Sequence, residues 1–407
     1  MTQIPLSLYI HVPWCEKKCP YCDFNSHLAR AKVDESAYVA ELLRDLDADL
    51  QNFALLSEET SEESSDESAV QLTGKPLKDR PIQSVFIGGG TPSLFSAKSY
   101  QLLFDGLRQR LNFAEHAEVT LEANPGSSEV EKFAGFRNAG INRLSIGVQS
   151  FNQTHLTALG RVHNANEALN AAAYAKQAGF DNFNLDLMFG LPEQSLSQSL
   201  DDVQQAIALN PTHLSCYQLT IEPNTLFHHS PPVTPGDELL WNMQEQLQQS
   251  LAKHGYSQYE VSAYSQTDKR CQHNLNYWQF GDYLGIGAGA HGKFTQANGN
   301  VVRTWKIKHP TTYIERDNKV GGKDTINAQQ IPFEFMMNAL RLNNGFAVET
   351  FETRTGIALK AIEPLLQKHQ SQGLIKRTSE LIQPTQFGHN MLNNMLEDYL
   401  SLELSYR

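Results

Sequence analysis

Three cysteines lie close together near the start of the 407-residue chain: Cys15, Cys19 and Cys22, within LYIHVPWCEKKCPYCDFNSH. The CxxxCxxC spacing lets three thiolates converge on one centre from a single loop. A structural zinc site usually takes four ligands, commonly as two separated pairs. An iron–sulfur cubane held by three cysteines instead leaves one iron open, and that iron can bind a small molecule. The spacing therefore predicts an open iron site, with zinc as the alternative metal.

The other two cysteines, Cys216 and Cys271, lie far along the chain. Five cysteines in this distribution do not make a disulfide framework. Either distant cysteine could supply a fourth ligand in space. Cys216 falls inside a predicted strand, where side chains alternate across the sheet, which argues against it.

The elements that must position these cysteines follow a βα pattern from residue 6 to about 253. We expect strands at 6–12, 84–89, 118–124, 143–150, 182–190 and 213–220. We expect helices at 35–52, 96–111, 128–138, 165–177, 197–209 and 238–254. Six consecutive units with short linkers predict an α/β fold in which a parallel sheet closes into a partial or full (β/α)6 TIM-type barrel, with the helices outside.

Polar residues and glycines lie at the carboxyl ends of all six predicted strands. In order they are the cysteines, the GGGT of 88–91, Glu122–Asn124, Gln149–Ser150, Asp186 and Thr220–Glu222. In parallel barrels the chemistry lies at the carboxyl ends of the strands, so these residues predict one lined cavity. An unpaired carboxylate ending a buried strand is costly. Glu122 and Asp186 should therefore meet a ligand, or else form a structural salt bridge.

Charge and hydropathy narrow the class of protein. The formal net charge is −12, and SEETSEESSDE at 57–67 carries six acidic residues and no basic one. The segment of about 57–80 lacks hydrophobic periodicity and predicts a disordered acidic insert. The charge outside it is still negative, which disfavours nucleic-acid binding. Because no apolar run is long enough for a membrane span or a secretory signal, we expect a cytoplasmic protein.

A CxxxCxxC motif after a first strand, with a glycine-rich loop after the second, resembles the radical S-adenosylmethionine superfamily. In that superfamily the open iron of a [4Fe-4S] cluster chelates the amino and carboxylate groups of S-adenosylmethionine. GGGT would remove side chains where the backbone approaches the ligand, and its N–H groups could hold a carboxylate. Over nearly the whole chain the resemblance extends to the HemN-like family, which comprises anaerobic coproporphyrinogen III oxidase-like enzymes and related heme chaperones.

This resemblance implies that Cys15, Cys19 and Cys22 bind the cluster. The residues that it implies around S-adenosylmethionine are Tyr9, Tyr21, Gly89, Gly90, Thr91, Glu122, Gln149, Arg161, Asp186, Thr220 and His291. Thr220 and His291 match by position rather than by identity.

The resemblance also implies a domain organisation. Residues 1–254 would form the radical S-adenosylmethionine core, 255–330 a barrel-capping segment that carries a heme motif, and 331–407 a small helical, winged-helix-like domain. From residue 332 onward seven Lys and Arg face eight acidic residues, so this last part predicts packing or partner docking rather than nucleic-acid binding.

Two features separate a dehydrogenase from a heme chaperone within this family. The family's dehydrogenases resemble one another in a fourth cysteine two positions after the third, where this chain has Phe24. The stretch HNLNYW matches the HNxxYW signature of the chaperone group. Its His273 would be an axial iron ligand, and Tyr277 and Trp278 would supply flat apolar surface. His11 and Cys271 stay open as alternative ligands.

The prediction is therefore a heme chaperone with a [4Fe-4S] cluster, S-adenosylmethionine and heme, which passes heme to an apo-hemoprotein, as in respiration. Oxygen-independent coproporphyrinogen III dehydrogenation is the alternative function, and nucleic-acid modification or binding is a third. Peripheral membrane contact and homodimerisation stay open. No amphipathic basic helix indicates membrane contact.

Overall fold

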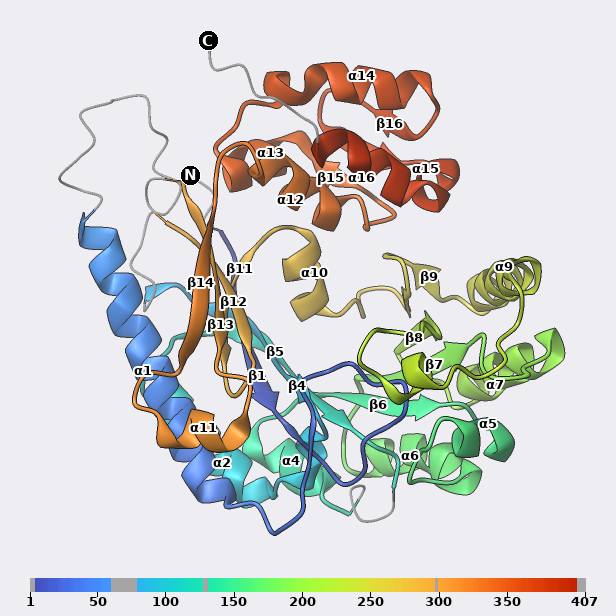
Figure 1. Cartoon of the computed structure of the whole chain (residues 1–407). Helices are drawn as coiled ribbons and strands as arrows, with labels where there is room; N and C mark the ends of the chain where they lie inside the picture. Colours follow the sequence, from blue (N-terminus) through green and yellow to red (C-terminus); the bar gives the residue numbers. More distant parts are fainter. Residues whose placement is uncertain (1–3, 60–78, 127–130, 297–298, 401–407) are drawn as a thin grey trace.

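A twelve-stranded sheet organises the molecule, in the order β14-β13-β12-β11-β1-β4-β5-β6-β7-β8-β10-β9 (Figure 1). The computed structural model describes residues 4–59, 79–126, 131–296 and 299–400. The six predicted strands are β1 (Leu6–Val12), β4 (Ile82–Gly89), β5 (Phe113–Ala123), β6 (Arg143–Gln149), β7 (Phe183–Phe189) and β8 (His213–Gln218). They pair in parallel in sequence order. The α/β prediction with six consecutive parallel strands is confirmed.

The six predicted helices are also present. They are α1 (Glu35–Glu59), α2 (Ala97–Arg108), α4 (Phe133–Ala139), α6 (Ala165–Gln177), α7 (Leu196–Ala208) and α9 (Asp237–Lys253). Capping boxes begin α6 at Asn164 and α7 at Ser195, where each cap side chain accepts a backbone N–H. Helix α1 runs past its predicted end at residue 52 and includes the first three residues of the predicted insert. Residues 60–78 of that insert lie outside the described residues. At its predicted end the expectation of disorder is wrong, because Arg80 is buried and ion-paired with Asp282.

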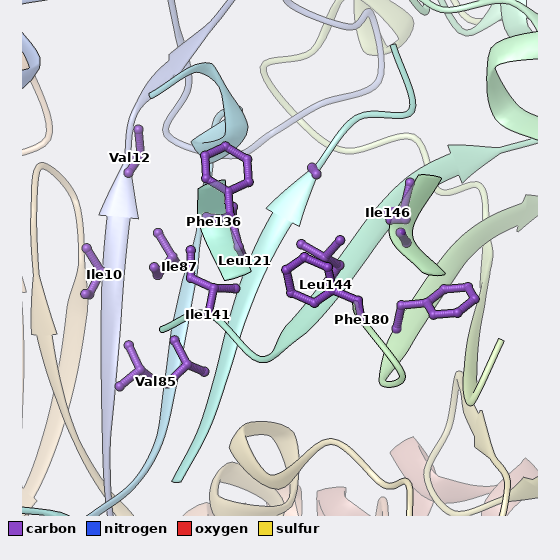
Figure 2. Packing of buried hydrophobic residues seen from close by; sticks show 14 of the residues in the cluster. Ile10, Val12, Val85, Ile87, Leu121, Phe136, Ile141, Leu144, Ile146 and Phe180 are labelled. Atoms are coloured by element: carbon purple, nitrogen blue, oxygen red, sulfur yellow. The ribbon is translucent and has the colours of Figure 1, made fainter. Parts of the chain in front are cut away.

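The core lies between the parallel strands and their helices. Figure 2 shows Ile10, Val85, Ile87, Leu121 and Leu144 of the strands packed in one apolar cluster, which Phe136 and Phe180 join. Strand β1 is buried at six of its seven positions. Near-continuous apolar strands are typical of parallel sheets that are covered on both faces, and they explain why these elements could be located from the sequence.

Residues 255–330 extend the same sheet at both edges. Beside β8 they add β10 (Ala263–Ser265) and β9 (Ser257–Gln258). At the other edge they add β11 (Asp282–Ile286), β12 (His291–Thr295), β13 (Val301–Lys306) and β14 (Val320–Ile326). Strand β11 pairs in parallel with β1, which is therefore an interior strand. The proposed boundaries at 254 and 330 stay predictions.

The C-terminal residues combine helices with a small antiparallel sheet, as expected of a winged-helix-like unit (Figure 1). The helices are α12 (Ile331–Ala339), α13 (Val348–Thr355), α14 (Glu363–Ser371), α15 (Gln386–Asn390) and α16 (Leu392–Leu400). The strands are β15 (Phe346–Ala347), β16 (Ile375–Arg377) and β17 (Leu381–Pro384). A second apolar cluster around Phe335, Phe351 and Ile382 holds them together.

The remaining elements are short: β2 (Trp14–Cys15), β3 (His27–Leu28), η2 (Pro92–Leu94), α5 (Gln153–Ala158), α8 (Leu226–His229), α10 (Gln272–Trp278), α11 (Pro310–Glu315) and η3 (Leu359–Ile362). Helix α10 contacts β1 and β4 on one side and α12 on the other. Among the described helices none has the length and apolarity needed to cross a bilayer.

Candidate cofactor site

A cavity of about 390 Å³ lies at the carboxyl ends of the parallel strands, as the strand-end residues predicted. The predicted residues that line it are Cys15, Tyr21, Cys19, Cys22, Gly89, Gly90, Thr91, Glu122, Gln149, Arg161, Asp186 and Thr220. Most come from the loop after β1 and from the ends of the strands that follow it, whereas Asp186 lies within β7 and Arg161 follows α5. The fold therefore brings twelve scattered positions to one place.

The cysteine loop is closed at its base by a short parallel pairing, in which Trp14 faces His27 and Cys15 faces Leu28. The Trp14 ring lies 4.7 Å from that of Tyr38 and 5.9 Å from that of Phe95, which fixes the loop against the core. A turn between Cys19 and Cys22, with the Cys22 N–H donating to the Cys19 carbonyl at 3.2 Å, brings these two residues together.

The thiols suit a cluster better than a single ion. Cys15 is buried, while Cys19 and Cys22 are partly exposed to the cavity. In an iron–sulfur cubane each cysteine binds a different iron, so three thiolates need to surround a volume. Three cysteines around one cavity fit that requirement.

The N–H groups of the GGGT loop bond within the protein in this structure, so their binding of a ligand carboxylate stays a prediction. The Gly89 N–H donates to Glu122 Oε2 at 3.1 Å, and the Gly90 and Thr91 N–H groups donate to the carbonyls of Val12 and Trp14. The glycines also serve close packing. A Cβ on Gly90 would lie 2.5 Å from the Trp14 carbonyl oxygen. The GGGT loop therefore supports the cysteine loop, and it also borders the cavity.

Two carboxylates face the cavity, Glu122 at the end of β5 and Asp186 in β7. Burial, and after it the charge of Asp186, raises the pKa of Glu122 to about 8. The Asp186 carboxylate accepts hydrogen bonds from Ser145 at 3.0 Å and Asn184 at 2.8 Å, yet burial still raises its pKa. No described salt bridge involves either carboxylate, so the structural alternative is not supported. A cationic ligand would relieve this pair.

Arg161 connects the cysteine loop to the strand ends. Its guanidinium donates to the Gly147 carbonyl at 2.8 Å and to Asn124 Oδ1 at 2.5 Å, and it lies 3.7 Å from Cys19 Sγ. Its Nε is buried without a partner among the described residues. Arg161 also opposes the rise that burial causes in the pKa of Tyr21. It therefore positions the loop and keeps an unused donor.

Gln149 ends β6 in a left-handed conformation, with φ of 66°. Such a conformation is unfavourable for a residue other than glycine, and it recurs at functional sites. The pairing of β6 with β7 is irregular at the same place. The distortion positions the Gln149 side chain at the cavity.

Two residues that the resemblance implied around S-adenosylmethionine lie elsewhere. Tyr9 donates to or accepts from His11 Nδ1 at 2.9 Å and is not among the residues that line the cavity. His291 is exposed on β12, with its ring 6.5 Å from that of Trp305. Their roles stay predictions.

Sequence reasoning also missed residues at the cavity. They include Glu16, Phe24, Ser145, Met188 and Tyr217. Tyr217 and Ser145 lie on strands that had been identified. Their side of the sheet follows from alternation along each strand, a signal that could have found them.

The HNLNYW stretch forms α10 and lies apart from the cofactor cavity. His273 is buried, with Nδ1 3.1 Å from Ser84 Oγ and Nε2 2.8 Å from Tyr277 Oη. Burial lowers its pKa to about 3. The Arg341 guanidinium covers the Trp278 ring at 4.5 Å. Both His273 nitrogens are thus engaged, so iron ligation would require the Tyr277 contact to break.

The alternative heme ligands are engaged as well. His11 lies between Tyr9 Oη and the Asn25 carbonyl, each at 2.9 Å. The Cys271 thiol is buried and donates to Glu118 Oε1 at 3.5 Å. Cys216 is buried in the main apolar cluster, in agreement with its exclusion as a fourth cluster ligand.

Comparisons with family models agree with this architecture. The model of the radical SAM superfamily matches residues 9–206, and the model of the HemN C-terminal domain matches residues 326–389. The structure of coproporphyrinogen III oxidase (HemN) from Escherichia coli has a similar fold, with a TM-score of 0.77 and 20% identity over 98% of this chain and 91% of that one. Fold and site together define a radical SAM protein with a HemN-type C-terminal domain.

Similar sequences narrow the assignment within this superfamily. Heme chaperone HemW of Haemophilus influenzae is 46% identical over 98% of this chain and 99% of its own. The Escherichia coli protein of that name is 47% identical over 98% of both chains, and that of Bacillus subtilis is 32% identical over 97% and 99%. The chain belongs to the HemW family.

Proposed function

We propose that this protein is a heme chaperone, which binds heme and passes it to apo-hemoproteins while holding a [4Fe-4S] cluster and S-adenosylmethionine. One observation carries the cofactor part: three cysteines, two carboxylates and Arg161 converge on one cavity at the strand ends. Heme chaperone HemW, the relative that this chain matches over nearly its whole length, supports heme and recipient hemoproteins as partners.

Within this proposal Cys15, Cys19 and Cys22 hold the cluster, whose open iron supplies a coordination position for the amino and carboxylate groups of S-adenosylmethionine. Glu122 and Asp186 favour a cationic ligand beside it. Gln149 and Thr220 border the same space and supply polar atoms. Arg161 links the cysteine loop to the strand ends through its contacts with Cys19 and Gly147. Tyr9 and His291 stay predicted contacts.

Anaerobic reconstitution tests the proposal. Purified protein is loaded with iron and sulfide, then titrated with S-adenosylmethionine and hemin while optical and EPR spectra are recorded. We expect a cluster signal that responds to S-adenosylmethionine, and a Soret band with hemin. Alanine at Cys15, Cys19 or Cys22 should remove the cluster, whereas Cys216→Ala should retain it. Zinc in place of iron, or a cluster indifferent to S-adenosylmethionine, would contradict the proposal.

The competing function is coproporphyrinogen III dehydrogenation. Phe24, which is 62% exposed and borders the cavity, occupies the place of the dehydrogenases' fourth cysteine. We therefore expect the reconstituted protein to leave coproporphyrinogen III unchanged in an anaerobic assay. Formation of vinyl products would replace the chaperone function with the enzymatic one.

A further inference from the structure

A chain of hydrogen bonds leads away from Asp186, the β7 carboxylate at the cofactor cavity. Asn184 lies two positions before Asp186 in β7, so the two side chains share one face of the sheet. In the parallel register of β7 and β8, Asn184 pairs with His213 and Asp186 pairs with Ser215. The alternation of two neighbouring strands therefore places buried polar side chains directly beside the carboxylate that faces the cavity.

Asn184 uses all of its hydrogen-bonding capacity. Its Nδ2 group donates to Asp186 Oδ1 and to Ser145 Oγ, each at 2.8 Å. Its Oδ1 lies 2.7 Å from His213 Nδ1 and accepts from Ser215 Oγ at 3.1 Å. An ionised carboxylate only accepts, so the amide must turn Nδ2 toward Asp186 and Oδ1 toward His213. An amide with both donors and both lone pairs engaged cannot rotate without losing several bonds.

The tautomer of His213 follows from these contacts. Because Asn184 Oδ1 can only accept, His213 must donate from Nδ1. Burial, and after it the charge of Arg143, lowers the pKa of His213 well below its usual value. The ring is therefore neutral, and its Nε2 accepts from the Tyr259 hydroxyl at 2.8 Å. A partner on the second nitrogen fixes both the tautomer and the orientation of an imidazole.

The far end of the chain is anchored at the start of α10. The Tyr259 Oη accepts the backbone N–H of Cys271 at 3.3 Å, and Glu118 Oε1 accepts that of Gln272 at 2.9 Å. Tyr259, His213 and Asn184 are each at most 2% exposed. Breaking any bond of this chain would leave a buried polar group without a partner, which is costly. The chain is therefore a rigid support with the cavity carboxylate at one end.

We propose that His213 is a positioning residue of the cofactor site, which acts through Asn184 to hold the Asp186 carboxylate in place for the cation of S-adenosylmethionine. His213 is not among the described residues that line the cavity, so it touches no ligand there. A carboxylate whose direction is set in advance needs less ordering when the ligand binds, which favours affinity. This inference rests on the S-adenosylmethionine site of the proposed heme-chaperone function.

Two substitutions separate the roles of the two His213 nitrogens. Asparagine places its amide nitrogen near the position of Nδ1, so His213→Asn keeps a donor for Asn184 and loses the contact with Tyr259. Glutamine reaches toward the position of Nε2, so His213→Gln keeps a partner for Tyr259 and loses the donor to Asn184. Both variants bury an amide, so a merely structural role of the ring predicts similar effects for the two.

Anaerobic calorimetry of cluster-loaded protein with S-adenosylmethionine measures the difference. His213→Gln should weaken binding by about tenfold or more, whereas His213→Asn should stay within about threefold of the wild type. Iron content and hemin binding should remain at wild-type levels in both variants. His254→Gln, at an exposed position that ends α9, is the control and should match the wild type.

A spectroscopic measurement needs no change at His213 itself. In wild-type protein labelled with ¹⁵N-histidine, the His213 signal is identified by its loss in His213→Gln or by its perturbation in Tyr259→Phe. We expect a neutral ring that carries its proton on Nδ1. Tyr259→Phe removes the donor to Nε2, so it should change this signal and weaken S-adenosylmethionine binding several-fold.

The outcomes separate this inference from the proposed function. Equal affinity in the two His213 variants, or weaker binding by His213→Asn than by His213→Gln, would overturn the positioning role and leave the chaperone function standing. A wild-type ring that carries its proton on Nε2 would overturn that role even if neither variant folded. A wild type that binds no S-adenosylmethionine would overturn both the inference and the cofactor part of the proposed function.

Discussion

Glu122 and Asp186 lie at one cavity wall with no described cation bonded to either, and the charge of Asp186 adds to burial in holding the pKa of Glu122 near 8. At neutral pH the Glu122 carboxyl is therefore largely protonated in the ligand-free protein. A cationic ligand that prefers the ionised form must release this proton.

The first prediction concerns the pH dependence of cofactor binding. S-adenosylmethionine carries a sulfonium charge, so its affinity should rise as pH increases toward 8, by up to about tenfold per unit. Above that pH the dependence should level off. Equilibrium dialysis of cluster-loaded protein between pH 6.5 and 9 measures it. Glu122→Gln should bind more weakly and lose this slope. Any pH dependence of affinity that remains in the variant comes from the amino group of S-adenosylmethionine itself. The same pH dependence in both proteins would show that Glu122 is not the group that titrates.

The second prediction concerns stability without cofactor. The raised pKa of Glu122 means that the folded protein keeps a proton that the unfolded chain has lost between about pH 4.5 and pH 8. The free energy of unfolding should therefore fall as pH rises through that window. Glu122→Gln should remove the loss, so the variant should gain about 1–4 kcal/mol on the wild type between pH 5 and 8.5. Urea unfolding at several pH values measures the difference. A difference that does not vary with pH would contradict the assignment.

The third prediction concerns Arg161. Replacing it by methionine removes the donors to Gly147 and Asn124 and frees the cysteine loop. Because two partly buried acceptors lose the Arg161 donor, we expect a cost of about 1–3 kcal/mol and a lower iron content after reconstitution. Iron analysis and denaturant unfolding measure the two effects. The matched control is Arg108→Met on the exposed side of α2. Full iron content in the Arg161 variant would show that it does not position the loop.

The fourth prediction concerns Gly90. An alanine there would place its Cβ 2.5 Å from the Trp14 carbonyl oxygen, which belongs to backbone and cannot rotate away. We expect Gly90→Ala to displace the cysteine loop and reduce cluster loading several-fold, about as a 1 kcal/mol distortion would. Gly236→Ala is the control, because its Cβ would meet nothing within 4 Å. Equal cluster absorbance in the two variants would show that the loop tolerates the change.

The fifth prediction concerns the anchor of α1. Lys306 of β13 lies 2.5 Å from Asp45 and 2.6 Å from Asp49, and all three are buried. Lys306→Met would leave two buried carboxylates without a cation, so we expect a loss of about 3–5 kcal/mol in the free energy of unfolding. Lys323→Met, at an exposed position on β14, should cost little. Adding Asp45→Asn and Asp49→Asn to the Lys306 variant should recover much of the lost stability. If stability is not recovered, the loss comes from disturbed packing rather than from unpaired charge.

Most bounds of the parallel strands could be predicted to within two residues because these strands are largely buried and are bounded by amphipathic helices; β5 is the exception, since its partly exposed first half begins at Phe113 rather than at the expected 118. The bounds of β1 and α6 agree with the expected 6–12 and 165–177. The strands from 255–330 were not predicted. Their pairing at both edges of the sheet depends on tertiary contacts such as β11 with β1, which leave little periodic signal in short segments.

The site was predicted unevenly for a physical reason. Residues that end strands converge by topology, so Glu122, Gln149 and Asp186 could be placed from order alone. The orientation of a seven-residue helix such as α10 depends on packing, and the sequence could not indicate that His273 turns toward Ser84. Likewise, the N–H groups after β4 are taken by backbone carbonyls that only the folded loop brings near.

The pairing of β1 with β11 has a consequence for how the protein is made. The strand that leads into the cysteines gains its second neighbour only when residues 282–286 have been synthesised. In a nascent chain that has emerged only as far as β8, the cysteine loop therefore follows a strand that still lacks its neighbour β11. Iron–sulfur loading should then be a late event in biogenesis, after most of the polypeptide has left the ribosome.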